Sequence, residues 1–474
     1  KSSIISKYFI RCINLYEYST INKMNLTNIN NTHTISLDKA TDFYQGNEII
    51  YVNKDVNITY NTDLYYIYVN DEKLQKYICM DQFSSIKSHF TYIYRIYIES
   101  TGGNGWCNND SARYAWDSTY VLEALIKMYE LYKDSYYLDL FEEIADKMIK
   151  TTDKQLNIYD QMRNIQINAW SCSRYYKFWA QKSDINDVKT TIHCIHSGFI
   201  CWNFIKFYNL VKNHNLTSYN AIADKLLEIS LENFNFIETE WVETTGKGGY
   251  FKDSPLRDIE FSNDGVPLNK NIICGMFCIE LYYATKNIKY KNYFIKVAEN
   301  FKHYINKEGQ GAKIYEDCIT WDYFPTVTKY VYYDNTYKTL TPRTEDIAHG
   351  AFAVDIIEEC VKLNVVFNES YLYKFANTFT KLIHKGGNNF AYKLDGTETP
   401  TSSSMLKYGG RINLISKYLP LAKYNKQIYN IINNYYINRN RLSVTNMTNN
   451  SINDFYLYGG YLILPFVDLL YYKN

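Results

Sequence analysis

"NIICGMFCIELYYATKNIKYKNYFIKVAENFKHYI", residues 271–305, holds two helix-period segments joined by the short connection "TKNIK". The first helix, expected over 270–286, carries small and aromatic residues near its start, in "NIICGMF". The second helix, expected over 290–306, is amphipathic with a charged face. Such a pair predicts an inner helix that is backed by an outer, solvent-facing helix.

The same pairing recurs along most of the chain. Further helices are expected over 111–132, 136–151, 190–213, 218–234, 347–364, 369–384, 404–419, 425–437 and 456–471. The connection within a pair is short, whereas the connection between pairs runs to roughly 20 to 40 residues. This alternation, with a period of about 70 to 80 residues, is typical of a helical repeat. It predicts a mainly α fold, an (α/α)6-type toroid with six inner helices and an outer layer.

The first hundred residues have a different pattern. "NEIIYVNKDVNITY" and "DLYYIYVND" are β-rich runs broken by Asn, Asp and Gly. They predict two or three strands, followed by a helix from about residue 80 to 98. We therefore expect two domains: a β-rich N-terminal region over 1–78 and an α/α-toroid catalytic domain over 79–474.

The composition narrows the class of protein. The 474 residues are 46% hydrophobic and 21% charged, which is typical of a globular protein with a large core. A net charge of +1 gives no indication of a nucleic-acid partner, and no apolar run is long enough to span a bilayer. The ten cysteines include no CxxC pair, so their spacing does not indicate zinc.

The compartment is predicted from two weak signals. N-glycosylation sequons, for example at Asn215 and Asn368, lean toward a secreted or secretory-pathway glycoprotein. The chain begins "KSSIISKYFIRC" without an initiator Met, which we expect to reflect a processed or truncated N-terminus.

The stretch "TPRTEDIAHGAFAVDIIEEC", residues 341–360, places unusual charges at the start of a predicted inner helix. Glu345 and Asp346 suit the positive end of the helix, and Thr344 or Asp346 can cap it. Capping explains neither Arg343 nor His349. The long loops all lead to this end of the inner helices, where positive helix ends favour an anionic ligand.

Four motifs follow one another in a familiar order: "HSGF" at 196–199, "VPLNKNIICGMFCIELYYATKN" at 266–287, "ITWDYFP" at 319–325 and "TEDIAHGAFAVDII" at 344–357. This succession resembles α/α-toroid carbohydrate-active enzymes, especially polysaccharide lyases of the alginate and glucuronan lyase type. It is also similar to the toroid part of glucuronyl C5-epimerases. The likeness covers residues 100–471 and leaves the β-rich region without a counterpart.

The resemblance implies cleavage of a uronic-acid polysaccharide or oligosaccharide by β-elimination. This reaction needs a group that neutralises the C6 carboxylate, a base for the C5 proton and an acid for the leaving oxygen. Residues of these types occur at the predicted inner-helix starts. The candidate catalytic residues are His349, His196, Tyr323 and Glu345. The candidate substrate-binding residues are Asn109, Arg113, Asn269, Trp321, Arg343, Tyr408 and Arg411. Because Asn and Arg can neutralise the uronate, we expect no metal and no other cofactor.

The sequence is also compatible with three other functions. A glycoside hydrolase on the same fold would use a carboxylate pair, with Asp110 or Asp117 facing Glu345 or Asp346. A glucuronyl C5-epimerase would share the proton abstraction but leave the polysaccharide intact. A toroid without catalysis would serve as a glycan-binding or structural protein.

Overall fold

The structure of the protein is a computed structural model that describes residues 112–172, 190–252, 266–307, 314–331, 337–398, 413–438 and 460–473, the strands between Met24 and Lys73, and single positions from residue 87 to 109. The chain divides into two compact units, residues 1–103 with 433–463 and residues 104–432 with 464–474. The domain boundary expected between residues 78 and 79 stays a prediction.

The first unit contains more strands than the two or three predicted. An antiparallel sheet has the order β1 (Met24–Ile29), β2 (Thr32–Leu37), β5 (Asn57–Asn61), β6 (Tyr66–Val69) and β7 (Glu72–Lys73). β3 (Thr41–Gln45) and β4 (Glu48–Val52) pair as a separate hairpin. Each apolar run is interrupted by turn residues, so the chain forms several short strands where sequence periodicity suggested a few longer ones.

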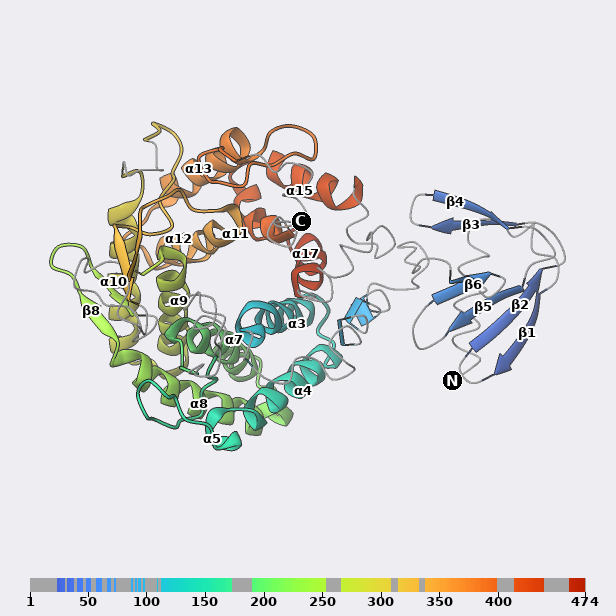
Figure 1. Ribbon diagram of the computed structural model, residues 1–474, viewed down its shortest axis with the longest axis horizontal. Coiled ribbons are helices and arrows are strands. Elements are labelled where there is room, and N and C mark those ends of the chain that lie inside the picture. The colour runs from blue at the N-terminus through green and yellow to red at the C-terminus, as the bar shows by residue number, and fades with distance from the viewer. Residues whose placement is uncertain are drawn as a thin grey trace. The chain divides into compact units, whose positions relative to one another are not determined.

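The second unit is an α/α toroid, as the helix pairing predicted (Figure 1). Its inner elements are the π-helix η2 (Tyr114–Ser118) with α3 (Thr119–Tyr132), α7 (Cys194–Asn213), α9 (Leu268–Thr285), α11 (Ile347–Gly350) with α12 (Phe352–Leu363), the 3-10 helix η6 (Asn413–Lys423) and α17 (Gly460–Tyr471). Its outer elements are α4 (Tyr136–Lys150), α8 (Asn220–Glu238), α10 (Ile288–Tyr304), α13 (Glu369–Asn377) with the π-helix η5 (Thr378–Ile383), and α15 (Gln427–Asn438).

Local sequence signals end one helix and start the next within each pair. Lys286 closes α9 with a left-handed φ of 60°, and the Asn287 side chain accepts a hydrogen bond from the Lys289 backbone to cap α10. In the next pair Asn364 closes α12 with a φ of 53°, and Asn368 caps α13. These short turns force the two helices of a pair to run antiparallel and to pack side by side.

Small residues on the inner helices allow close packing within and between pairs. A Cβ at Gly275 of α9 would lie 2.7 Å from Val297 of α10, and one at Gly198 of α7 would lie 3.1 Å from the Cys274 sulfur. The small residues that the sequence places near inner-helix starts therefore serve, at these positions, to bring the helices together.

The structure corrects several predicted elements. The helix expected over 404–419 is described only from Asn413, where it is a 3-10 helix that contains Pro420 and extends to Lys423. The long connections also contain two hairpins, β8 (Trp241–Glu243) with β9 (Gly249–Phe251) and β10 (Thr328–Val331) with β11 (Tyr337–Leu340). Such three- and four-residue strands are too short for a periodic signal.

A layer of aromatic side chains crosses the inside of the toroid. Phe199 of α7 contacts Trp116 of η2, Tyr120 of α3 and Phe352 of α12, with ring centroids 5.7, 5.5 and 5.4 Å away and edge-to-face geometry. All four side chains are buried. We call these four residues the aromatic layer. It joins the N-terminal parts of α3, α7 and α12.

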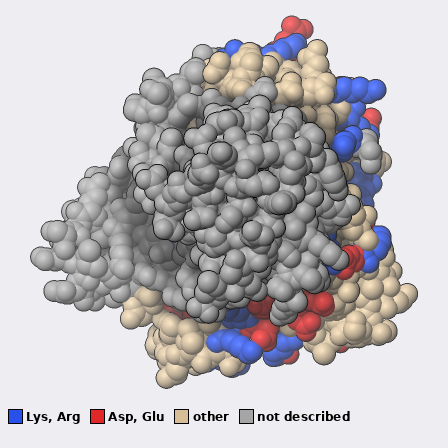
Figure 2. Space-filling model, turned by 90° about the vertical axis from the view of Figure 1, so that its right-hand side faces the viewer, with Lys and Arg blue, Asp and Glu red and all other residues tan. Residues whose placement is uncertain are grey.

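The surface carries both signs of charge. On the coloured part of the face in Figure 2, Lys and Arg side chains lie among Asp and Glu side chains, as the net charge of +1 would suggest. Within the described part of the chain, no helix combines the length and the apolar character needed to cross a membrane.

Candidate active site

His349 lies in the first turn of α11, where it is paired with a carboxylate. Asp346 caps the helix: its Oδ1 accepts hydrogen bonds from the backbone N–H groups of Ala348 and His349, both at 3.0 Å. Its Oδ2 lies 2.6 Å from His349 Nδ1. Because a carboxylate only accepts, Nδ1 carries the hydrogen and Nε2 is left as the basic nitrogen. The His349 side chain is 21% exposed, so this nitrogen belongs to a partly open site.

Glu345 supports the same helix start from inside the protein. It is fully buried, and its Oε1 accepts a hydrogen bond of 2.9 Å from the Asp346 backbone N–H. The nearest approach of its carboxylate to His349 Nδ1 is 4.0 Å. Asp346 thus contacts the imidazole directly and Glu345 holds the backbone of Asp346, while the catalytic role expected for Glu345 stays a prediction.

Tyr323 and Arg343 line the accessible side of His349. The Tyr323 ring lies 5.5 Å from the His349 ring, and the Arg343 guanidinium lies 5.9 Å from the Tyr323 ring. Their segments are tied together, since the Tyr323 N–H donates to the Arg343 carbonyl at 2.7 Å. Arg343 is exposed and Tyr323 is partly exposed. An imidazole and a phenol are thus in contact at one inner-helix start, and a guanidinium lies beside the phenol.

His196 lies deeper, below the same group. It is fully buried, with Asn109 Nδ2 3.2 Å from its Nδ1 and Trp116 Nε1 3.3 Å from its Nε2. Both neighbours are donors, whereas a neutral imidazole has only one acceptor nitrogen and an imidazolium has none. These contacts hold the ring in a fixed position inside the protein. The expectation that His196 is catalytic stays a prediction.

Trp116 connects the two histidines and was missed as a site residue. Its ring lies edge-on to both His196 and His349, with centroids 6.3 and 6.0 Å away. The signal was present in the sequence, because "ARYAWD" stands at a predicted inner-helix start. The sequence criteria selected charged and polar residues at the helix starts, so this aromatic residue was not among the candidates.

The other predicted binding residues have separate locations. Trp321 is 1% exposed and packs between Phe301 and Phe375, so the expected sugar platform is wrong and the residue belongs to the core. Asn269, the second residue of α9, is buried, and neither of its amide atoms has a hydrogen-bond partner among the described residues. Arg113 lies partly buried at the start of η2. Tyr408 and Arg411 lie outside the described residues.

Three side chains at this end could in principle hold a metal ion. One ligand atom each from Glu345, Asp346 and His349 lies within 4.8 Å of the others. However, both Asp346 oxygens and Glu345 Oε1 already accept the hydrogen bonds given above. A metal would have to replace those bonds, so the expectation of a metal-free site stays a prediction.

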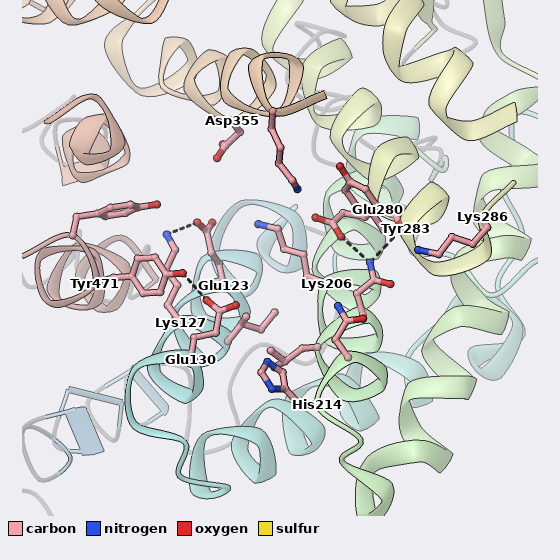
Figure 3. Close-up of a pocket in the computed structure, with 16 residues that line it drawn as sticks. Glu123, Lys127, Glu130, Lys206, His214, Glu280, Tyr283, Lys286, Asp355 and Tyr471 are labelled. Carbon is pink, nitrogen blue, oxygen red and sulfur yellow. Dashed lines mark hydrogen bonds and ion pairs between the residues drawn. The ribbon is translucent and has the colours of Figure 1, made fainter. Parts of the chain in front are cut away.

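A cavity lies at the other end of the inner helices, where the sequence gave no indication of a site. It has a volume of about 530 Å³ and is lined by the C-terminal parts of α3, α7, α9 and α17 together with α12 (Figure 3). Prominent lining residues are Glu123, Lys127, Lys206, Glu280, Asp355 and Tyr471. We call it the C-terminal cavity.

No protein-family model and no curated protein matches the sequence. Several solved structures resemble the chain at low identity. A GH76A α-1,6-mannanase from Salegentibacter sp. HEL1_6 is 12% identical to this chain, with a TM-score of 0.46. The match covers 81% of this chain and 99% of the mannanase chain. A family 76 glycoside hydrolase from a bovine Bacteroides thetaiotaomicron strain has 10% identity, 96% and 99% coverage, and a TM-score of 0.49. A D-mannose isomerase has 13% identity, 77% and 88% coverage, and a TM-score of 0.43. None of these three is named as a lyase.

Proposed function

We propose that the protein is a carbohydrate-active enzyme that uses His349 for general acid–base catalysis at the N-terminal end of the inner helices. The observation that supports this is the 2.6 Å contact between His349 Nδ1 and Asp346 Oδ2. It directs the basic Nε2 away from the carboxylate, as in other histidines that move protons. The imidazole also lies in ring contact with the Tyr323 phenol, which in turn lies beside the Arg343 guanidinium.

The accessible side chains favour β-elimination on a uronic-acid glycan. His349 would remove the C5 proton, the bond between C4 and its oxygen would break, and a double bond would form between C4 and C5. Tyr323 would give its phenolic proton to the leaving oxygen, and Arg343 would neutralise the C6 carboxylate. The carboxylates beside them, Glu345 and Asp346, are buried and hydrogen-bonded, which does not suit a pair that flanks a glycosidic bond.

Hydrolysis is the second candidate, and one residue favours it. Asp322, beside Tyr323 in sequence, is buried, and its Oδ1 has no hydrogen-bond partner among the described residues. Burial, with a smaller contribution from Asp395, raises its pKa to about 6. A carboxyl whose pKa is raised in this way is what a glycosidase needs as its general acid. The mannanase and the family 76 glycoside hydrolase reported above carry the names of hydrolases.

Product analysis separates these reactions. The protein would be incubated with glucuronan, alginate and α-1,6-mannan, and the products followed by ultraviolet absorbance and mass spectrometry. Elimination yields an unsaturated uronate that absorbs in the ultraviolet. Hydrolysis yields saturated products that are heavier by one water, and an epimerase leaves chain length unchanged. We expect unsaturated products from a uronic-acid polymer. Saturated products alone would transfer the proposal to hydrolysis, and no reaction with any glycan would refute the enzymatic function.

A further inference from the structure

The C-terminal cavity combines room for a ligand with a dense set of charged side chains. Its volume of about 530 Å³ lies within the range of small-molecule sites, roughly 300 to 1,000 Å³. The side chains that face it come from four inner helices and the end of α17, so the helical framework fixes their positions (Figure 3).

Some of these charges are committed to one another. Lys127 Nζ lies 2.8 Å from Glu123 and 2.7 Å from Asp468, which joins α3 to α17. Lys417 of η6 lies 3.3 Å from Glu123 and 3.6 Å from Asp355. These pairs close the ring of inner helices and account for the buried charge on one side of the cavity.

Other charges have no opposite charge in contact. Over the described part of the chain, no carboxylate oxygen lies within ion-pair distance of Lys206 or Lys286. The Lys206 ammonium lies 4.3 Å from the Trp202 ring centre and points into the space between Glu123 and Glu280 (Figure 3). On the acidic side, Glu280 accepts a hydrogen bond of 2.8 Å from the Asn209 amide, and Glu130 accepts one of 2.8 Å from the Tyr471 hydroxyl.

The lining is therefore balanced, with two lysines and two carboxylates that make no ion-pair contact among the described residues, although the Lys206 charge acts on Glu123 and Glu280 from a longer distance. A cationic ligand would face Lys206 and Lys286, and an anionic ligand would face Glu280 and Glu130. A hydroxyl group both donates and accepts, so it can bind an ammonium and a carboxylate with no charge of its own. We propose that the C-terminal cavity is a second binding site, for a neutral, hydroxyl-rich ligand such as a short oligosaccharide.

This inference does not depend on the reaction proposed for His349. The two sites lie at opposite ends of the inner helices and share none of the residues named above. Tyr471, at the rim of the cavity, adds an aromatic ring on which a sugar face can stack.

Binding is tested by calorimetry on the full chain with three trisaccharides of matched length. These are neutral maltotriose, a fully deacetylated and therefore cationic glucosamine trisaccharide, and an anionic triuronate. Maltotriose should bind more tightly than the two charged probes. Lys206→Met and Glu280→Gln should each weaken it about 10- to 100-fold, the effect of losing one hydrogen bond to a charged group. Lys225→Met, an exposed lysine of α8 that pairs with Glu228, is the matched control and should bind normally.

Melting curves establish that each variant is folded before its affinity is compared. His349→Ala should retain maltotriose binding, because it changes the other end of the toroid. Failure of maltotriose to bind, or tighter binding of a charged probe or of zwitterionic glycylglycine, would overturn the proposal. Binding that is lost in His349→Ala but unchanged in Lys206→Met would also overturn it, by placing the saccharide at the N-terminal end, and would leave the proposed function intact.

Discussion

The two ends of the inner helices use charge in opposite ways. At the N-terminal end, His349 and Asp346 interact within one helical turn, and the pair can form as soon as that turn forms. At the C-terminal end, Lys127 contacts Asp468, which lies 341 residues away in the sequence. The first arrangement leaves a basic nitrogen for chemistry, whereas the second uses its charges to join helices. The difference teaches that the same kind of charge pair can orient a catalytic side chain at one end of the helices and join distant helices at the other.

The largest effect on stability is expected at the C-terminal end. Lys127→Met removes the ammonium between Glu123 and Asp468 and leaves two buried carboxylates without it. Breaking a buried ion pair in this way costs about 3–5 kcal/mol. Urea unfolding should show that loss, while the rate per folded molecule stays normal. A variant as stable as the parent would show that this network does not hold the ring together.

Buried carboxyls at the two ends should also respond differently to pH. Burial alone would raise the pKa of Glu123, but Lys127 and Lys417 outweigh it and hold that pKa well below its usual range. Among the described residues Asp322 makes no ion pair with a lysine. Burial, together with the charge of Asp395, raises its pKa from 3.8 to about 6. Between pH 3.8 and about 6, Asp322 binds more protons in the folded state than in the unfolded state. The free energy of unfolding therefore falls as the pH rises to about 6.

Replacing Asp322 isolates this pH effect. A shift of about two pKa units corresponds to at most about 3 kcal/mol. Asp322→Asn should therefore be more stable than the parent at pH 8, by up to that amount, and equally stable at pH 4. Thermal melts across this range measure the difference, with Asp224→Asn, an exposed carboxylate on α8, as the control. Parallel curves for parent and Asp322→Asn would show that Asp322 ionises freely.

A smaller effect is expected from the partner of His349. Asp346→Asn retains a side chain that caps helices well, so stability should change little. It removes the charge that orients the imidazole and fixes its tautomer, so kcat should fall. Steady-state kinetics should show this loss in kcat with KM nearly unchanged. An equal rise in KM with normal kcat would mean that Asp346 binds substrate instead.

The smallest effect is expected from chelation. Treatment with EDTA should leave turnover unchanged, because the oxygens of Asp346 that could bind a metal already accept hydrogen bonds. Complete loss of activity that one divalent ion restores would contradict this and would turn the group of Glu345, Asp346 and His349 into a metal site.

The toroid was predictable because each helix pair is encoded locally. The short connection "TKNIK" closes α9 at Lys286 and caps α10 at Asn287, and both signals can be read from a few residues. The His349 turn was predictable for the same reason, since the cap and the imidazole are three residues apart. Periodicity could not give the short hairpins in the connections.

Burial and long-range pairing could not be predicted from the same patterns. Trp321 occurs in a loop, which suggested a sugar platform, yet Phe301 and Phe375 from two outer helices enclose it. The sequence also could not show that donors from Asn109 and Trp116 lie beside the two ring nitrogens of His196. The C-terminal cavity forms from helices that are far apart in the sequence, so it has no motif.

The proposed acid–base mechanism depends most directly on His349. His349→Ala should lower the rate about 10²- to 10⁴-fold, the usual contribution of a general acid or base. Its melting temperature should stay close to that of the parent, because the side chain is partly exposed and the Asp346 cap of α11 remains. Turnover and melting are to be measured on the same preparation. A variant that turns over normally but melts several degrees lower would make His349 a structural residue and contradict the proposed mechanism.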